Sequence, residues 1–425
     1  ARKWLSSRMG ELVVGIDIGT TKVCTIVGEV RETDIYVLGV GIEPSHGMRK
    51  GMVTDVNALS ASISSSVHKA ERSSGYEIGR AFVSVAGGHI ESINSTGAVG
   101  ISNTRGVELV DLDRAMDAAR AVPLPHGREV LHVIPRNYTL DGQTNLRSPL
   151  GMLGFRLEVE AHIITAGTAN IRNLEKCVES AGVYVDRFIL NPLASGDVVL
   201  TPEEREAGVM VVDVGGGTTD LALFVDGAVW HTAVIAVGGQ HITNDIAHVL
   251  HLPLELAEAV KLQYGHADPK AVSPLEAFPI QPFGEELPSK VQRSDLALIV
   301  NARVAEIFEL VLKEIKRSGY DGLLKAGIVL TGGSSLLPGI KTVAADVLRM
   351  PVRVAQPEHI TGMAEALKNP SYSTSVGLLK LGLIMDLEDD RRKGFGANGK
   401  SRPGPNLGRF LRRALGRLLP GDEDA

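Results

Sequence analysis

Short apolar runs interrupted by a glycine-rich turn occur twice in this chain, far apart along the sequence. Residues 15–22 read GIDIGTTK and precede the apolar run Val23–Val27, and residues 211–220 read VVDVGGGTTD and precede Leu221–Val225. Each copy also follows an apolar run. The pattern predicts a strand, a turn of the form Asp-x-Gly and a second strand, so the same hairpin is made twice.

A third apolar run ends in a glycine turn. Residues 327–339 read GIVLTGGSSLLPG, which predicts a strand, a Gly-Gly-Ser turn and a helix. Elsewhere the pattern predicts a strand over 31–43, a helix from an Asp55 cap to about Ser74, a strand over Ala81–Val85, a strand and helix within 163–182, and a mostly helical stretch over 238–325.

Residues 86–162 interrupt the first half of the chain. The pattern there predicts short strands over His89–Ser95, Val130–Tyr138 and Arg156–Ile164, and one amphipathic helix over Asp111–Ala121. We therefore expect a compact α+β subdomain inserted into a larger domain.

The repeated turn has a composition suited to phosphate. Glycines adopt backbone angles closed to other residues and bring bare N–H groups close to an anion, and the threonine hydroxyls add donors. The aspartate that ends each first strand, Asp17 or Asp213, suits a hydrated Mg²⁺ ion, which takes oxygen ligands and keeps several waters. Two such hairpins facing each other would clamp a polyphosphate.

The two hairpins and the Gly-Gly-Ser turn resemble the phosphate-1, phosphate-2 and adenosine motifs of the actin/Hsp70/sugar-kinase ATPase superfamily, in the same order. The resemblance spans about residues 12–385. It implies an α/β fold of two actin-like (ribonuclease-H-like) domains around a nucleotide cleft, with ATP between them.

Pattern and resemblance together predict seven segments. These are an N-terminal extension (1–11), a first actin-like domain (12–85 and 163–200), the inserted subdomain (86–162), a second actin-like domain (201–237 and 326–385), its small helical-rich subdomain (238–325), a flexible linker (386–405) and an amphipathic helix (406–420).

Composition narrows the class of protein. A net charge of −6 gives no sign of general nucleic-acid affinity. Cys24 and Cys177 lie in apolar contexts and fit neither a disulfide framework nor a metal site. The first eight residues lack the apolar core of a signal peptide, and no apolar run is long enough to span a membrane. We expect a cytoplasmic protein.

Residues 406–419 read NLGRFLRRALGRLL and predict an amphipathic helix that Asn406 caps and Pro420 ends. The apolar stripe contains Leu407, Phe410, Leu411, Ala414, Leu415, Leu418 and Leu419. The other face carries Arg409, Arg412, Arg413 and Arg417. An arginine-rich helix on a Gly/Pro-rich leash favours an anionic membrane surface. The alternatives are a helix packed on its own domain and a docking helix for a partner protein.

The insert and the terminal helix, on this fold, resemble the bacterial cell-division family FtsA. Further local matches are GMRKGMVTD (47–55), SVAGGHIES (84–92), GGQHITNDIA (238–247) and LNPLASG (190–196). The resemblance implies a peripheral protein on the cytoplasmic face of the cell membrane at the division septum. It would polymerise through its insert and second-half domain, bind anionic lipids and meet downstream divisome membrane proteins.

The resemblance also implies that the family recruits the tubulin-like protein FtsZ, whose tail peptide docks on the small second-half subdomain. Arg293 and Arg303 lie in that region and are candidates to receive an acidic peptide. The alternative for each arginine is an ordinary solvated charge.

The resemblance assigns roles in the cleft. Asp17 and Asp213 would order Mg²⁺ and its waters. The phosphates of ATP would meet Gly19, Thr20, Thr21, Gly215, Gly216, Gly217 and Thr218, with Gly238 and Gly239 also in the nucleotide site. Lys22 would add a charge, or point outward. Gly332, Gly333 and Ser334 would line the adenosine pocket. Glu258 and Lys261 would close over adenine and ribose, or form an exposed ion pair.

Strongly hydrolysing relatives carry Glu or Gln where this chain has Asn191. This shorter amide holds water but cannot act as a base, so we expect ATP binding with slow turnover at most.

Two alternatives stay open. A type IV pilus assembly protein resembling PilM has the same plan without a membrane helix, and a small-molecule kinase would show rapid ATP use only with an added metabolite. An Hsp70 chaperone would need a peptide-binding domain after residue 385, and MreB-like filament proteins lack the insert.

Overall fold

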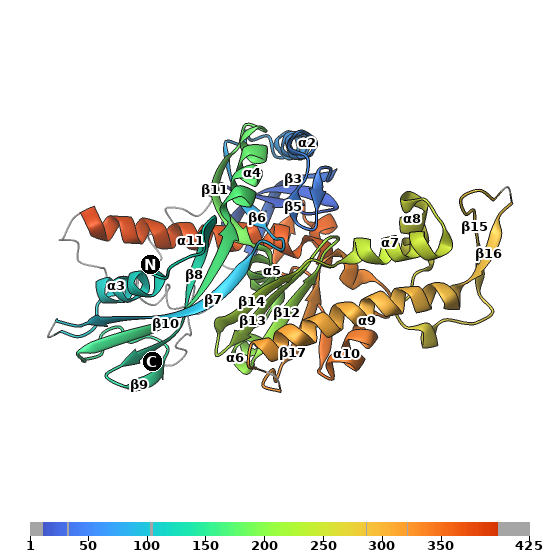
Figure 1. Cartoon of the computed structure of the whole chain (residues 1–425). Helices are drawn as coiled ribbons and strands as arrows, with labels where there is room; N and C mark the ends of the chain where they lie inside the picture. Colours follow the sequence, from blue (N-terminus) through green and yellow to red (C-terminus); the bar gives the residue numbers. More distant parts are fainter. Residues whose placement is uncertain (1–11, 32–33, 103–104, 286, 321, 398–425) are drawn as a thin grey trace.

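The computed structural model describes residues 12–397 apart from 32–33, 103–104, 286 and 321. The predicted N-terminal extension (1–11) and amphipathic helix (406–420) lie outside the described residues. The molecule is elongated, with two sheets in the middle, the insert at one end and the small second-half subdomain at the other (Figure 1). Among the helices of the described part, none is both long enough and apolar enough to cross a membrane.

The first sheet has the strand order β11-β6-β1-β2-β3-β19. Its strands are β1 (Leu12–Ile18), β2 (Lys22–Arg31), β3 (Asp34–Pro44), β6 (Arg80–Val85), β11 (Tyr184–Leu190) and β19 (Ile360–Gly362). The first three strands are antiparallel, and β6 and β11 continue the sheet in parallel. Helices α2 (Val56–Ser74) and α4 (Thr168–Glu179) pack together beside it. As predicted, Asp55 caps α2 by accepting two backbone N–H groups.

The second sheet repeats this plan with the order β14-β13-β12-β17-β18. Its strands are β12 (Val209–Val214), β13 (Thr219–Val225), β14 (Ala228–Ile235), β17 (Gly327–Thr331) and β18 (Val352–Val354). Again an antiparallel meander of three strands is extended by two parallel strands. Helices α9 (Arg293–Arg317) and α10 (Ile340–Leu348) pack together beside it. Helix α5 (Asn191–Val199) connects the halves through the short α6 (Pro202–Ala207). The predicted pair of actin-like α/β domains is confirmed.

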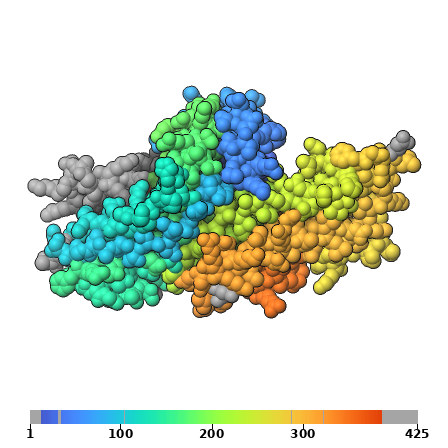
Figure 2. Space-filling view, viewed as in Figure 1, coloured from blue at the N-terminus to red at the C-terminus, as the bar shows by residue number. Residues whose placement is uncertain are grey.

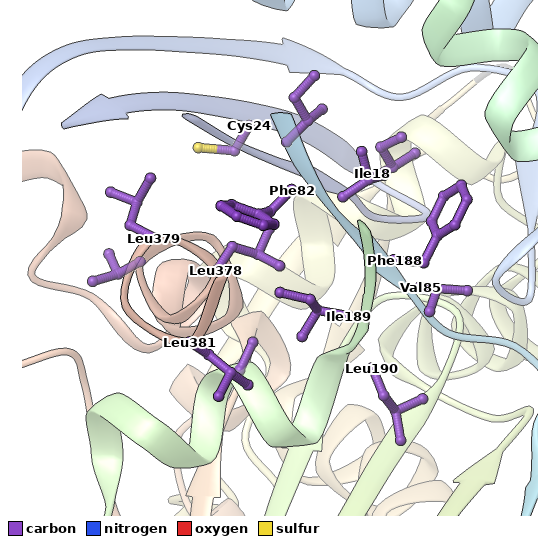
Figure 3. Packing of buried hydrophobic residues seen from close by; sticks show 14 of the residues in the cluster. Ile18, Cys24, Phe82, Val85, Phe188, Ile189, Leu190, Leu378, Leu379 and Leu381 are labelled. Carbon is purple, nitrogen blue, oxygen red and sulfur yellow. The ribbon is translucent and has the colours of Figure 1, made fainter. Parts of the chain in front are cut away.

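The end of the chain returns to the first domain, so assigning all of 326–385 to the second domain is wrong. Strand β19 pairs with β3, and helix α11 (Ser373–Ala397) packs on β1, β2 and β6. Leu378, Leu379 and Leu381 are fully buried against the first core, near Phe82 and Ile189 (Figure 3). A sheet buried on both faces needs helices on both, and α11 is the second cover for the first sheet.

The predicted flexible linker 386–405 is wrong over residues 386–397, where helix α11 continues. Residues 386–397 are helical in the structure. Once a helix is nucleated, each further residue adds a hydrogen bond at little cost, and no proline or glycine occurs between 386 and 393 to stop it.

The insert has its own sheet, of order β7-β10-β8-β9. Its elements are β7 (Glu91–Gly100), α3 (Leu109–Arg120), β8 (Arg128–Leu140), β9 (Gln143–Leu146) and β10 (Arg156–Gly167). Helix α3 packs closely on β7 because Gly97 carries no Cβ, which would overlap the helix backbone at Ala115 and Ala119. The predicted helix and three strands are present, and β9 was not predicted. Thr165 pairs with Glu91, so the chain enters and leaves the insert side by side.

The insert also contacts the second domain along β14, an edge strand of the second sheet. His162 Nε2 lies 2.9 Å from Thr232 Oγ1, and Ser92 Oγ donates to the Thr232 carbonyl at 2.9 Å. The Arg136 guanidinium stacks 3.8 Å from the centre of the Trp230 ring. These polar contacts stand beside apolar packing, since Ile134 of β8 and Val234 of β14 belong to the same hydrophobic cluster.

The small second-half subdomain contains α7 (Gly239–Leu250), α8 (Leu254–Tyr264), part of α9 and a hairpin of β15 (Ala277–Ile280) and β16 (Ser289–Gln292). The helices agree with the predicted helical stretch. The hairpin was not predicted, because each strand has only four residues and β15 contains Pro279.

Helices α5 and α11 cross so closely at Gly377 that a Cβ there would overlap the Ala194 carbonyl. We expect Gly377→Ala to lower the free energy of unfolding by about 1–3 kcal/mol, the usual cost of overpacking, although alanine favours helix. Urea denaturation measures this. Gly79→Ala is the matched control, since a Cβ there meets nothing within 4 Å. Equal midpoints for the two variants would contradict the close crossing.

Candidate nucleotide site

The two predicted hairpin turns close in the same way. The Gly19 N–H donates to the Lys22 carbonyl at 2.9 Å, and the Gly215 N–H donates to the Thr218 carbonyl at 2.9 Å. The strands on either side pair up to the edge of each turn. The repeat in the sequence is therefore a repeat in backbone geometry.

The two turns face each other across the domain boundary. A Cβ on Gly217 would overlap the side chain of Thr20, and one on Gly216 would overlap Thr21. Only glycine permits this approach, which brings backbone N–H groups and threonine hydroxyls of both domains to one place. An anion held there would contact both turns.

Asp17 and Asp213 end β1 and β12 and are buried, each 7% exposed. Burial raises the pKa of both carboxyls, that of Asp213 to about 6, and the charge of Asp17 adds to the rise at Asp213. Ser84 and Ser375 donate to Asp17, and Thr374 donates to Asp213. These hydroxyls only partly offset the negative charge, so the site favours a cation.

Lys22 points into the site rather than outward. Its Nζ donates to the Ser371 carbonyl at 2.5 Å and lies 3.6 Å from the centre of the Tyr372 ring. Burial lowers its pKa, whereas the nearby Asp17 and Asp213 raise it. Lys22 therefore supplies one positive charge to the acidic centre.

The third glycine turn lies against the second hairpin. Gly332 has a φ of +84°, and a Cβ there would overlap Asp213. Ser334 Oγ and the Gly239 N–H both donate to the Gly215 carbonyl, at 3.0 and 2.9 Å. A Cβ on Gly238 would lie 2.6 Å from that same carbonyl. Next to this junction, a Cβ on Gly333 would meet only the Ser371 side chain, at the ordinary contact distance of 3.4 Å.

Glu258 and Lys261 form an ion pair of 2.7 Å on α8. Both also bond to Thr243 of α7, and Lys261 Nζ donates to the Gly239 carbonyl at 3.3 Å. The structure shows the predicted ion pair, which adjoins the turn that contains Gly239. Closure of the pair over adenine and ribose stays a prediction.

Asp220 is a site residue that we did not predict. It pairs with Asp213 across the hairpin, is 2% exposed, and accepts bonds from Thr218 Oγ1 at 3.2 Å and Asn191 Nδ2 at 3.3 Å. Burial, then Asp213, raises its pKa well above the usual range. The corresponding residue of the first hairpin is Cys24. The final Asp of VVDVGGGTTD, which the first repeat lacks, was the signal in the sequence.

Two buried oxygens at this point, Asn191 Oδ1 and Asp220 Oδ1, have no hydrogen-bond partner within the described residues. Buried polar atoms are normally bonded, so these oxygens suit a ligand or its water. No cluster of three His, Cys, Asp or Glu side chains in the described ranges could ligate a metal directly. The donor set therefore fits a hydrated ion carried by a phosphate ligand, with aspartates meeting its waters.

Arg293 and Arg303 lie apart from this site and are already paired. Arg293 binds Glu276 at 2.6 Å and the Tyr264 carbonyl at 2.9 Å. Arg303 binds Asp245 at 2.6 Å and also Glu306. An acidic peptide would have to displace these carboxylates.

Comparison with known proteins agrees with this architecture. A family model for cell division protein FtsA matches residues 210–377, and a model for the SHS2 domain inserted in FtsA matches residues 87–165. Similar solved structures include a PilM–PilN type IV pilus biogenesis complex (TM-score 0.63, 17% identity, covering 87% of this chain and 98% of that one). Another is MreB5 of Spiroplasma citri bound to ADP (TM-score 0.51, 15% identity, covering 91% and 99%). These likenesses show an actin-like fold.

Curated relatives are much closer in sequence. Cell division protein FtsA of Pseudomonas aeruginosa is 44% identical over 379 residues, which cover 89% of this chain and 91% of that protein. The Escherichia coli K12 protein is 38% identical over 380 residues, covering 88% and 90%. Such identity over nearly the whole length distinguishes this chain from the PilM-like alternative. The chain belongs to the FtsA family of cell-division proteins.

Proposed function

We propose that this chain binds Mg·ATP in the cleft, assembles into filaments and anchors FtsZ to the cytoplasmic membrane at the division site. The observation that carries the nucleotide part is the meeting of two glycine hairpins from two domains around buried aspartates. Phosphate oxygens would accept from the turns, and a hydrated Mg²⁺ would neutralise Asp17 and Asp213. The adenosine would lie beside Gly333, with Glu258 and Lys261 at its edge.

Hydrolysis would be slow. Asn191 and Asp220 offer two unbonded oxygens to an attacking water, but an amide is no base, and burial favours the protonated form of Asp220. The nucleotide would then act mainly as a ligand for assembly.

The ends of the molecule support head-to-tail assembly. Leu153 and Phe155 of the insert are 74% and 82% exposed, and Leu275 and Leu287 of the small subdomain are 91% and 78% exposed. The insert and this subdomain lie at opposite ends (Figure 2). A contact between two unlike surfaces repeats without closing, which builds a filament.

The FtsZ tail peptide would dock on the second half of the chain. Because Arg293 and Arg303 are already paired, a groove between α9 and α10 is a more open place. This cavity of about 450 Å³ is lined by Lys270, Leu298, Asn301 and Val343, among others. It offers apolar contacts, an amide and the positive charge of Lys270, and its lining also includes Asp268 and Asp346, so apolar residues of the peptide would supply most of the contact.

The membrane contact would come from residues 406–420. Electrostatics supplies about 1 kcal/mol per arginine near an anionic surface, so one helix binds reversibly. Several helices in a filament would bind more firmly through avidity.

Asp213→Ala is expected to weaken Mg-dependent ATP binding at least 100-fold (about 3 kcal/mol), because it removes an anchor for the ion. Gly333→Val is expected to do the same by filling the adenosine pocket, where the protein itself has room for a side chain. Calorimetric titration measures both, with Gly79→Val as control. Unchanged ATP affinity in folded Asp213→Ala and Gly333→Val would refute the site.

Phe155→Asp is expected to prevent protofilaments while leaving ATP affinity unchanged, since it charges an exposed apolar end. Electron microscopy on lipid monolayers with ATP gives the readout. Tyr184→Asp, in a side chain 63% exposed on the first domain, is the control. Normal filaments from Phe155→Asp would exclude this insert surface as a filament contact.

Leu411→Glu or Leu415→Glu is expected to abolish liposome binding at any salt, because a carboxylate enters the apolar stripe. Changing Arg412 and Arg413 to Ala should cost about 2 kcal/mol at low salt and less as salt screens the lipid charge. Co-sedimentation with anionic liposomes tests this. A form truncated after Pro405 that pellets as well as the full chain would rule out this helix as the anchor.

A further inference from the structure

The first turn of α11 contains three consecutive buried hydroxyls, each bonded to the end of a different strand. Ser373 Oγ lies 2.7 Å from Thr331 Oγ1 on β17. Thr374 Oγ1 donates to Asp213 Oδ2 on β12 at 2.9 Å, and Ser375 Oγ donates to Asp17 Oδ2 on β1 at 2.7 Å. All three side chains are at most 6% exposed. One helical turn therefore bonds the key aspartate of each domain.

These two bonds set where the carboxylates point. Residues adjacent on a helix project about 100° apart, so Thr374 and Ser375 point in different directions, and one bonds to Asp213 while the other bonds to Asp17. An ionised carboxylate only accepts hydrogen bonds, so each hydroxyl donates and selects one oxygen. The other Asp17 oxygen accepts from Ser84 Oγ at 2.9 Å, which fixes that side chain at both ends.

Helix α11 cannot slide to relax these bonds. Two residues further along, Gly377 packs against the Ala194 carbonyl of α5 without room for a Cβ. One turn later, Lys380 Nζ lies 3.1 Å from Asp197 Oδ2, also on α5. The turn that holds the aspartates is thus anchored to the helix that connects the two domains.

We propose that Thr374 and Ser375 are positioning residues, which fix the orientation and separation of Asp17 and Asp213 for the hydrated cation of a bound nucleotide. This inference rests on the proposed Mg·ATP site. The waters of Mg²⁺ keep near-ideal octahedral geometry, so carboxylates that accept from them must sit at defined places. Mutation of residues that orient such groups typically weakens metal binding 10- to 100-fold.

The test is an ATP-binding titration against Mg²⁺ concentration. Thr374→Val keeps the shape and removes the donor, and Ser375→Ala removes the other donor. Each is expected to raise the Mg²⁺ concentration for half-maximal binding about 10-fold or more, with ATP affinity in EDTA unchanged. Thr374→Ser, which keeps a hydroxyl, should restore the wild-type requirement. Ser373→Ala is the matched control, because its bond goes to Thr331 and not to an aspartate.

Thermal melting establishes that each variant is folded, and Ser375→Ala, a small truncation, decides the matter if Thr374→Val does not fold. If folded Ser375→Ala and Thr374→Val need the same Mg²⁺ concentration for half-maximal ATP binding as the wild type, this inference is overturned and the proposed function is not. An equal loss of ATP affinity in EDTA would also overturn it, since the hydroxyls would then act on the fold of the cleft. No Mg·ATP binding by the wild-type chain would instead overturn the proposed function and this inference with it.

Discussion

Like charge buried at one place is the constraint on which the rest of this structure depends. Asp17, Asp213 and Asp220 lie together out of solvent. Burial raises the pKa of each, and repulsion from neighbouring aspartates adds to the rise at Asp213 and Asp220. Such a cluster persists only if the surrounding fold supplies donors and positive charge. Lys22, the hydroxyls of α11 and the glycine turns provide them from both domains. The two sheets, the connecting helix and α11 therefore meet around buried negative charge, which a ligand that carries a cation would neutralise.

The two domains share strand order and turn geometry but differ in the residues that lie opposite their aspartates. Strand order and turn closure repeat between the sheets, and Asp17 and Asp213 occupy matching places. Across the hairpin, however, Asp17 faces Cys24 whereas Asp213 faces Asp220. Burial raises the pKa of the Cys24 thiol to about 12, so it stays neutral. The second hairpin alone thus carries an extra carboxyl next to Asn191, which concentrates polar function on one side of a pseudosymmetric cleft.

Local features of the fold could be predicted from the sequence, whereas long-range ones could not. The two glycine hairpins, the α2 cap at Asp55 and the insert elements other than β9 follow from periodicity and turn residues over short windows. The place of α11 does not, because it depends on contacts with strands far away along the chain, such as Leu378 against Gly15 and Leu379 against Gly28. The ion pair between Arg303 and Asp245 could not be predicted either, because it joins two helices that lie far apart along the chain. Asp220 was overlooked because its importance depends on the strand register opposite Asp213.

The polar contact between the insert and β14 has a consequence for solubility. β14 is an edge strand, and unpaired edges invite other chains to add strands and aggregate. The insert's β7, β8 and β10 lie along β14 in the same molecule, with Ser92 accounting for one of its carbonyls. This cover combines hydrogen bonds and a stacked Arg136 with apolar packing, because Ile134 of β8 and Val234 of β14 belong to the same hydrophobic cluster. The insert thereby covers this sheet edge within the same molecule, which limits the access of strands from other chains.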